Sequence, residues 1–298
     1  MRISDLFLAA DRRLRPTWRA VLFVPVFVAL VFGFSTAAFT LLGHGRFQAD
    51  PELGLMLSAY VTVLSAALTT LVFLPLLDRR SYRTLGLWFY PGWGREFSLG
   101  LAGGVVLISA VVGLMALFGQ VEFRAGSLDA PAMLGALAWY VLLLLPAATF
   151  EELVFRGYPF QRLVEGVGAL GAVLVLSALF GLVHLGNPSP TSLSTANTML
   201  VGVLFALAYL KTRALWLPIG LHFAWNFWLG FVVSLPVSGL ELSRTLLVAK
   251  VSGPEWLSGG SYGPEGSLLT TAVILAATFW LARTRRLVVS PELARELQ

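Results

Sequence analysis

Long apolar runs dominate the chain, and short polar, Gly- or Pro-containing links separate most of them. A helix needs roughly 20 apolar residues to cross a bilayer. About eight runs approach this length, the fifth, sixth and eighth being the shortest: 20–42, 53–77, 97–118, 132–155, 167–185, 193–210, 215–235 and 268–281. The pattern therefore predicts an all-α fold, a polytopic bundle of about eight transmembrane helices.

Composition agrees with a chain built for lipid. Hydrophobic residues make up 57% of the 298 positions and charged residues 12%, whereas a soluble domain carries roughly 25% charged residues. The first apolar run is too long for the hydrophobic region of a cleavable signal, so it is expected to stay as the first span. The chain has no cysteine, which excludes disulfides and thiolate chemistry.

The distribution of positive charge predicts the orientation. Eight spans place both termini on one side, and 17 of the 21 Lys and Arg residues fall on that side. The other side holds the remaining 4, Arg46, Arg124, Arg244 and Lys250. Because cytoplasmic loops are enriched in Lys and Arg, both termini are expected in the cytoplasm. The net charge of +5 therefore concerns topology, and no nucleic-acid partner is expected.

Domain organisation is predicted to be simple. The chain shows no convincing repeat or low-complexity segment, so residues 1–298 are expected to form a single integral membrane domain. Residues 236–266 form the long link, which should be an ordered, turn-rich loop on the outer side. The polar residues of interest fall in a core of approximately residues 131–235.

A pair of glutamates follows a long uncharged stretch. Residues 131–150 carry no charge, and Glu151 and Glu152 come directly after them. Neighbouring helical residues point about 100° apart, so the two carboxylates are not expected to share one task. Arg156 lies one turn after Glu152 and can pair with it, which leaves Glu151 free to face a cavity. The plainer interpretation is that the helix simply reaches the cytoplasmic headgroups there.

Two of the 3 histidines lie in predicted spans, whereas His44 lies in the first outer loop. His184 ends the sequence FGLVH, and His222 precedes Asn226 by one helical turn. Ionisable residues at membrane depth are costly and usually functional. The alternative for each residue is a plain hydrogen bond between helices.

Together the motifs run in the order EExxxR, FxxxH and HxxxN on three different predicted spans. This set resembles the CPBP (CAAX protease and bacteriocin-processing, also called Abi) family, which includes the type II CAAX prenyl endopeptidases. Residues 215–220, LWLPIG, resemble the usual lead-in to the family's last motif. Residues 252–267 resemble a segment common in bacterial members before the last span.

The resemblance implies an intramembrane endopeptidase. Glu151 and His184 would activate a water molecule, since a carboxylate in a site of low dielectric constant suits a general base. His222 and Asn226 would stabilise the oxyanion. Glu152 and Arg156 would be a structural pair, and removing either partner would leave a buried charge.

The cofactor stays open. Glu151, His184 and His222 with one free position match the ligands of catalytic Zn²⁺, and related families are often labelled metalloproteases. The alternative is metal-free catalysis in which Glu151 activates water directly. The HExxH helix of soluble zinc proteases is absent, because the two histidines lie on separate spans.

Other functions compete with proteolysis. An intramembrane Glu, His and Asn could relay protons or bind cations, as in a transporter or a non-enzymatic bacteriocin-immunity-type protein. The sequence shows no inverted repeat, which argues against a transporter. The expected partners are a peptide or protein substrate and the lipid bilayer. The expected location is a prokaryotic inner membrane, which the chain crosses several times; neither the substrate nor the oligomeric state can be read from the sequence.

Counting along straight helices gives a conflict in depth. Glu151 lies about 30 Å along its helix, near the cytoplasmic face, whereas His184 lies deep in the next helix and should approach the outer face. The site can form only if the fifth helix begins later or tilts, or if the fourth helix begins later. The span edges near residues 166–171 are the least well defined. The prediction is a site in the membrane interior, reached through a polar cavity.

Overall fold

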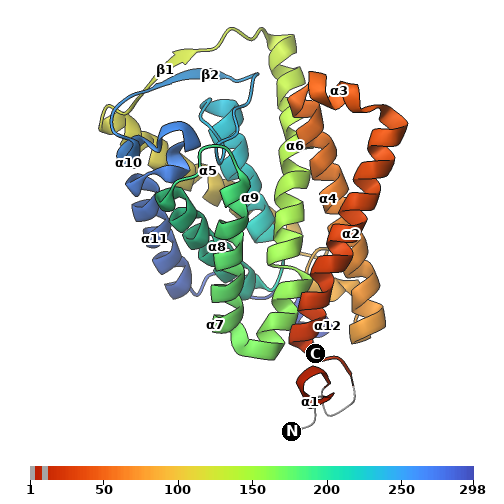
Figure 1. Cartoon of the computed structure of the whole chain (residues 1–298). Coiled ribbons are helices and arrows are strands. Elements are labelled where there is room, and N and C mark those ends of the chain that lie inside the picture. Colours follow the sequence, from red (N-terminus) through yellow and green to blue (C-terminus); the bar gives the residue numbers. More distant parts are fainter. Residues whose placement is uncertain (1–3, 9–12) are drawn as a thin grey trace.

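The computed structural model describes residues 4–8 and 13–298, and most of them belong to helices packed side by side (Figure 1). The longer helices are α2 (Pro16–Leu42), α4 (Pro51–Phe73), α5 (Trp93–Leu117), α6 (Ala130–Phe155), α7 (Tyr158–Val183), α8 (Ser192–Thr212), α9 (Trp216–Phe227) and α11 (Leu268–Arg283). Short elements are α1 (Ser4–Phe7), α3 (His44–Ala49), α10 (Glu255–Ser258), α12 (Pro291–Glu296) and the strands β1 (Val121–Ala125) and β2 (Leu247–Val251). Arg2 and Arg12 of the charge count, and the side chain of His44, lie outside what is described.

Local sequence signals explain where these helices begin. Proline stands in the first turn of α2, α4, α6 and α7, where its missing N–H costs no helical hydrogen bond. Asp50 and Asp129 cap α4 and α6 by accepting hydrogen bonds from backbone N–H groups three residues later.

Each predicted apolar run overlaps one of the eight longer helices. Within the described residues, five helical segments are long and apolar enough to cross a membrane, and the longest, Ala130–Gly186, joins α6 to α7. The helix α9 is shorter than its predicted span because it passes into a π-helical segment, η4 (Trp228–Val232). The count of eight spans and the cytoplasmic position of both termini stay predictions.

The helix α2 exposes apolar side chains on its outer surface. Val24, Val28 and Phe32 are 53%, 54% and 73% exposed, although all three are strongly apolar. A continuous apolar face of this kind is covered by lipid in a membrane protein, which is consistent with the predicted first span.

A bend in α7 removes the conflict in depth. Gly168 has φ 81° and ψ 164°, far from helical values, and glycine adopts such a positive φ without a steric penalty. The helix therefore folds back at the lower edge of the bundle, and only its second part runs along α8 (Figure 1). This returning part, 169–183, is about 22 Å long and ends beside Glu151, with 3.8 Å between the Glu151 carboxylate and the His184 ring. The returning helix thus begins later than the predicted start at residue 167, which is one of the conditions under which the site can form. The depth of His184 in the membrane stays a prediction.

Close backbone packing between α5 and α9 fixes the helix that carries His222. A Cβ atom added to Gly104 would lie 2.4 Å from the carbonyl oxygen of Leu221, and one added to Gly100 would lie 2.3 Å from that of Leu217. Small residues one turn apart let two helices approach in this way. The position of His222, next to Leu221, therefore depends on the glycines of α5.

The strands β1 and β2 form a two-stranded antiparallel ribbon with Val121 opposite Val251, over the upper end of the bundle (Figure 1). The all-α prediction missed this ribbon. Its partners lie far apart in sequence, and each strand is only 5 residues long, so neither resembles a span. The predicted long link, 236–266, contains β2, α10 and several tight turns.

Candidate active site

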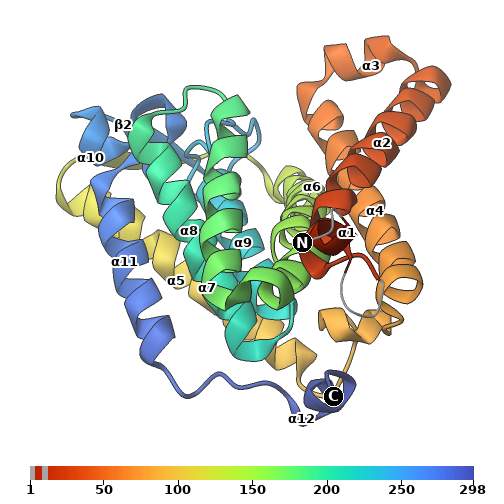
Figure 2. The same ribbon diagram turned by 60° about the horizontal axis from the view of Figure 1, so that its bottom comes forward.

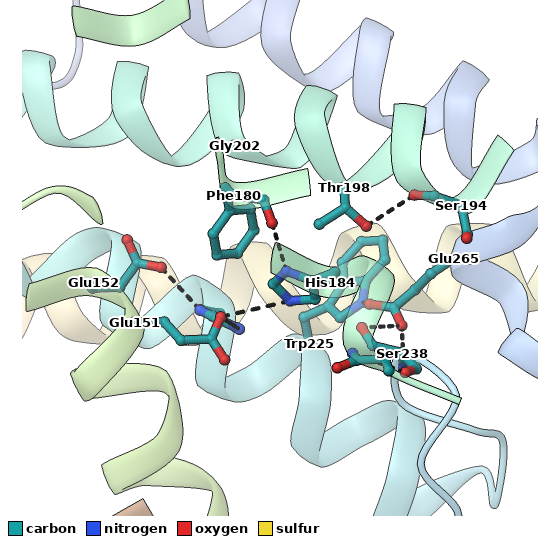
Figure 3. Close-up of polar contacts among 12 residues, drawn as sticks. Glu151, Glu152, Phe180, His184, Ser194, Thr198, Gly202, Trp225, Ser238 and Glu265 are labelled. Atoms are coloured by element: carbon teal, nitrogen blue, oxygen red, sulfur yellow. Dashed lines mark hydrogen bonds and ion pairs between the residues drawn. The ribbon is translucent and has the colours of Figure 1, made fainter. Parts of the chain in front are cut away.

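Three helices bring the predicted residues together. Glu151 lies one turn before the end of α6, His184 directly follows α7, and His222 lies in the middle of α9. The Oε2 atom of Glu151 lies 3.8 Å from Nε2 of His184 and 3.9 Å from Nε2 of His222 (Figure 3). Asn226, one turn after His222, lines the same cavity.

The hydrogen bonds of the two rings decide which nitrogen faces the centre. Nδ1 of His184 lies 2.6 Å from the carbonyl oxygen of Phe180, which can only accept. Nδ1 of His222 lies 2.9 Å from Oε1 of Glu152. Both Nδ1 atoms therefore carry a proton, and in the neutral rings both Nε2 lone pairs point toward Glu151.

The Glu152 carboxylate links α6 to α9, and its partner Arg156 extends the link to α8. Glu152 is fully buried and lies 3.2 Å from Nη1 of Arg156, as the spacing of the two residues predicted. Arg156 also donates to the carbonyl oxygen of Gly202 at 3.1 Å and lies 4.4 Å from the centre of the Phe180 ring. The contact from Glu152 to His222 was not predicted, because it joins residues 70 positions apart. Glu152 therefore orients a site histidine as well as pairing with Arg156.

A cavity of about 420 Å³ opens in front of these residues. Its wall includes a carboxylate that sequence reasoning missed, Glu265, in the turn before α11. Glu265 accepts hydrogen bonds from Nε1 of Trp225 at 3.0 Å and from the backbone N–H and hydroxyl of Ser238. Figure 3 shows the His184 ring with Glu151 on one side and Glu265 on the other. Glu265 stands within residues 252–267, so the resemblance of that segment was the available signal.

Burial also affects the charge of Glu265. Removal of the carboxylate from solvent raises its pKa, and the hydrogen bonds from Ser238 and the nearby His184 partly oppose this effect. The cavity wall thus contains an acid that is protonated more readily than an exposed glutamate.

The arrangement is suited to holding one water molecule. Oε2 of Glu151 is buried and has no hydrogen-bond partner among the described residues. Its separations of 3.8 and 3.9 Å from the two Nε2 atoms are too long for direct hydrogen bonds. A water at about 2.8 Å from each atom can bridge separations of this size.

The same atoms are candidate ligands for zinc. Two imidazole nitrogens and a carboxylate are the right donors, but ligands of one tetrahedral zinc ion lie only about 3.4 Å apart. Within the described part of the chain, no three His, Cys, Asp or Glu side chains converge closely enough to hold a metal. The side chains as they stand do not fit zinc.

Comparison with known proteins points to one family. Residues 133–228 match the family described as Type II CAAX prenyl endopeptidase Rce1-like. The "Putative membrane peptidase YdiL" of Bacillus subtilis (strain 168) is 32% identical over 112 residues, which cover 38% of this chain and 41% of that protein. The match thus spans about two fifths of the curated relative's length. No solved structure matches the chain.

The matched residues 133–228 contain Glu151, His184, His222 and Asn226. The apolar helices and the relative named as a membrane peptidase identify the chain as a multi-pass membrane protein. The segment that carries the site is thus similar to the Rce1-like family of type II CAAX prenyl endopeptidases.

Proposed function

We propose that this protein is an endopeptidase that hydrolyses a peptide bond inside the membrane. The observation that carries this proposal is the position of Glu151 Oε2, buried and unpartnered, 3.8 and 3.9 Å from two histidine nitrogens. The family match of the same segment supports a peptidase over the alternatives of a transporter or an immunity-type protein.

The reaction begins with a water molecule held between Glu151 and His184. Glu151 takes a proton from the water as its oxygen bonds to the carbonyl carbon of the substrate. The carbonyl oxygen becomes an oxyanion. When the tetrahedral intermediate collapses, the C–N bond breaks and the proton passes from Glu151 to the leaving amine.

His222 and Asn226 would stabilise the oxyanion, and His222 can do so only in one protonation state. Because Nδ1 donates to Glu152, Nε2 becomes a donor only when both ring nitrogens carry protons. The Glu152 carboxylate favours this charged ring by pairing with it at 2.9 Å. A donor of this kind is typically worth about 3 kcal/mol in the transition state.

The environment strengthens these interactions. Glu152 and Arg156 are almost completely removed from solvent, and His222 is 6% exposed. In a region of low dielectric constant a fixed charge acts on the oxyanion more strongly than it would in water.

The test uses the protein purified in detergent with prenylated and unprenylated peptides. Wild type should cleave at least one of these, whereas Glu151→Gln, His184→Ala and His222→Ala should each lose most of the activity. Glu292→Gln is the matched control, because Glu292 lies in α12 and pairs with a largely exposed arginine. Folded variants of the three residues that all keep the wild-type rate would refute the proposal.

Two further measurements address the alternatives. Metal analysis of the same samples tests the zinc hypothesis, for which a stoichiometric metal lost in His184→Ala is the expected result. Counterflow in liposomes tests the transporter hypothesis.

A further inference from the structure

The basic residues gather at one end of the bundle, where ion pairs join the segments that carry them. Arg19 of α2 and Arg162 of α7 both bind the carboxylate of Asp78, which follows α4. Arg83 binds Glu296 of α12 at 3.1 Å. These contacts define the arginine-rich end, to which α1 and α12 also belong (Figure 1).

The other end carries the strands and is called the ribbon end. Glu52, at the start of α4, accepts hydrogen bonds from Tyr140 at 2.8 Å and from the Ser243 hydroxyl at 2.7 Å, which ties α4, α6 and the long link together. The segments at this end hold only 4 of the 21 basic residues. The positive-inside rule therefore places the ribbon end on the non-cytoplasmic side.

The cavity lies toward the ribbon end. Apart from α6 and Phe205 of α8, the helices that line it contribute the half nearest to that end, and the long link covers it. Examples are Ser58 near the start of α4, Val183 at the end of α7, Asn197 in the first half of α8, Asn226 near the end of α9 and Thr270 at the start of α11.

On the arginine-rich side, an apolar core closes the site. One turn beyond Glu151, α6 contributes Phe155, and α8 and α9 contribute Tyr209 and Ile219. All three are buried, and Tyr209 is completely so. A substrate approaching from this side would have to open the packed core, which costs far more than entering a cavity that already exists.

The cavity reaches the surface at α4 and α7. Ser58 and Val183 line it and are both exposed, Val183 by 57%. Figure 2 shows α4 and α6 on one side of the molecule and α7 and α8 on the other. The exposed part of the cavity wall therefore lies on α4 and α7, in the half of both helices nearer the ribbon end.

We propose that the cavity takes its substrate from the non-cytoplasmic side, as a polypeptide segment at the outer end of a membrane-anchored or exported protein. This inference rests on the proposed function for its substrate and on the charge asymmetry for its direction. An exported segment would reach Glu151 past Ser58 without unfolding the core.

Because the chain has no cysteine, single cysteines can report the accessible side directly. Ser58→Cys places a thiol in the cavity, Ser252→Cys marks the exposed ribbon end, and Ser81→Cys marks the exposed arginine-rich end. The probe is a membrane-impermeant sulfonated maleimide, applied to right-side-out vesicles and to the same vesicles opened with detergent.

The expected result is labelling of Ser58→Cys and Ser252→Cys in sealed vesicles, and of Ser81→Cys only after detergent. The proposal is overturned if Ser58→Cys follows Ser81→Cys, if it stays unlabelled even in detergent, or if the two end markers exchange their behaviour. Labelling does not require proteolysis, so it remains decisive even if no peptide is cleaved.

A second arm tests the substrate. A peptide that wild type cleaves in detergent is placed at the non-cytoplasmic or the cytoplasmic end of a single-span reporter and expressed with the protease. Cleavage of the non-cytoplasmic reporter alone is expected, and cleavage of the cytoplasmic reporter alone would contradict the inference.

Discussion

Replacing Glu152 by alanine tests how much the buried Glu152 carboxylate contributes to stability. Glu152 is completely buried and contacts Nη1 of Arg156 at 3.2 Å and Nδ1 of His222 at 2.9 Å. After Glu152→Ala, the Arg156 guanidinium would keep the Gly202 carbonyl and the face of Phe180 as direct contacts, and Glu151 as a negative charge nearby. A buried charge that has lost its direct ion-pair partner is poorly compensated.

The expected cost can be bounded from this geometry. Removing one partner of a buried ion pair destabilises a protein by about 3–5 kcal/mol, because the other charge stays buried. The lost contact to His222 belongs to the same network, so its contribution is not added separately. We therefore expect Glu152→Ala to lower the free energy of unfolding by about 3–5 kcal/mol.

The assay is reversible unfolding in detergent, followed by tryptophan fluorescence. Glu292→Gln removes an exposed pair in which the Arg295 side chain is 73% exposed, and should change stability by less than about 1 kcal/mol. The double variant Glu152→Leu with Arg156→Met replaces both charges by apolar groups and should recover most of the loss. It should not recover peptide cleavage, because His222 still lacks its carboxylate.

Two results would refute this reasoning. One is a Glu152→Ala variant whose stability changes as little as that of Glu292→Gln, which would mean that Arg156 finds solvent or another anion. The other is a double variant no more stable than Glu152→Ala, which would mean that shape rather than charge explains the loss.

Other predictions concern packing, charge and catalysis. Gly104→Ala should lower the free energy of unfolding by about 1–3 kcal/mol and reduce cleavage, because the new methyl group meets the Leu221 carbonyl. Gly113→Ala on the same helix is the control: its methyl group meets nothing, so stability should be unchanged or raised. Unfolding and cleavage are measured on both variants, and equal results for the two would contradict the prediction. Burial raises the pKa of Glu265, so its contribution to stability is complete below the ordinary carboxyl pKa and is lost as pH rises through the raised value. The difference in free energy of unfolding between wild type and Glu265→Gln should therefore become less favourable to wild type as pH rises. A difference that does not change with pH would contradict this prediction. Asn226→Ala should lower kcat/KM by about two to three orders of magnitude without a loss of stability, and an unchanged kcat/KM would remove Asn226 from the oxyanion site.

Sequence reasoning located the helices and singled out Glu151, His184 and His222 because both depend on strong local signals, whereas their grouping came from the family resemblance. Apolar runs of span length are unmistakable, and charged residues inside them stand out. The spacing of Glu152 and Arg156 likewise predicted an ion pair that the structure places at 3.2 Å.

The features that were missed depend on distant parts of the chain. The bend at Gly168 follows from one backbone conformation, which a run of apolar letters does not encode. Glu265 enters the cavity only because the long link folds back over α8 and α9, and Glu152 reaches His222 only when α6 packs against α9. The β1–β2 ribbon joins two short segments on either side of the site, so local periodicity could not pair them.

The most direct test of the central claim is the cleavage rate of Glu151→Gln in purified form. Since Oε2 of Glu151 makes no hydrogen bond within the described residues, the amide should leave folding intact, and unfolding measurements should match wild type. The account predicts a loss of cleavage by a factor of about 10² or more, as expected when a general base is removed. A folded Glu151→Gln protein that cleaves the same peptide at the wild-type rate would contradict it.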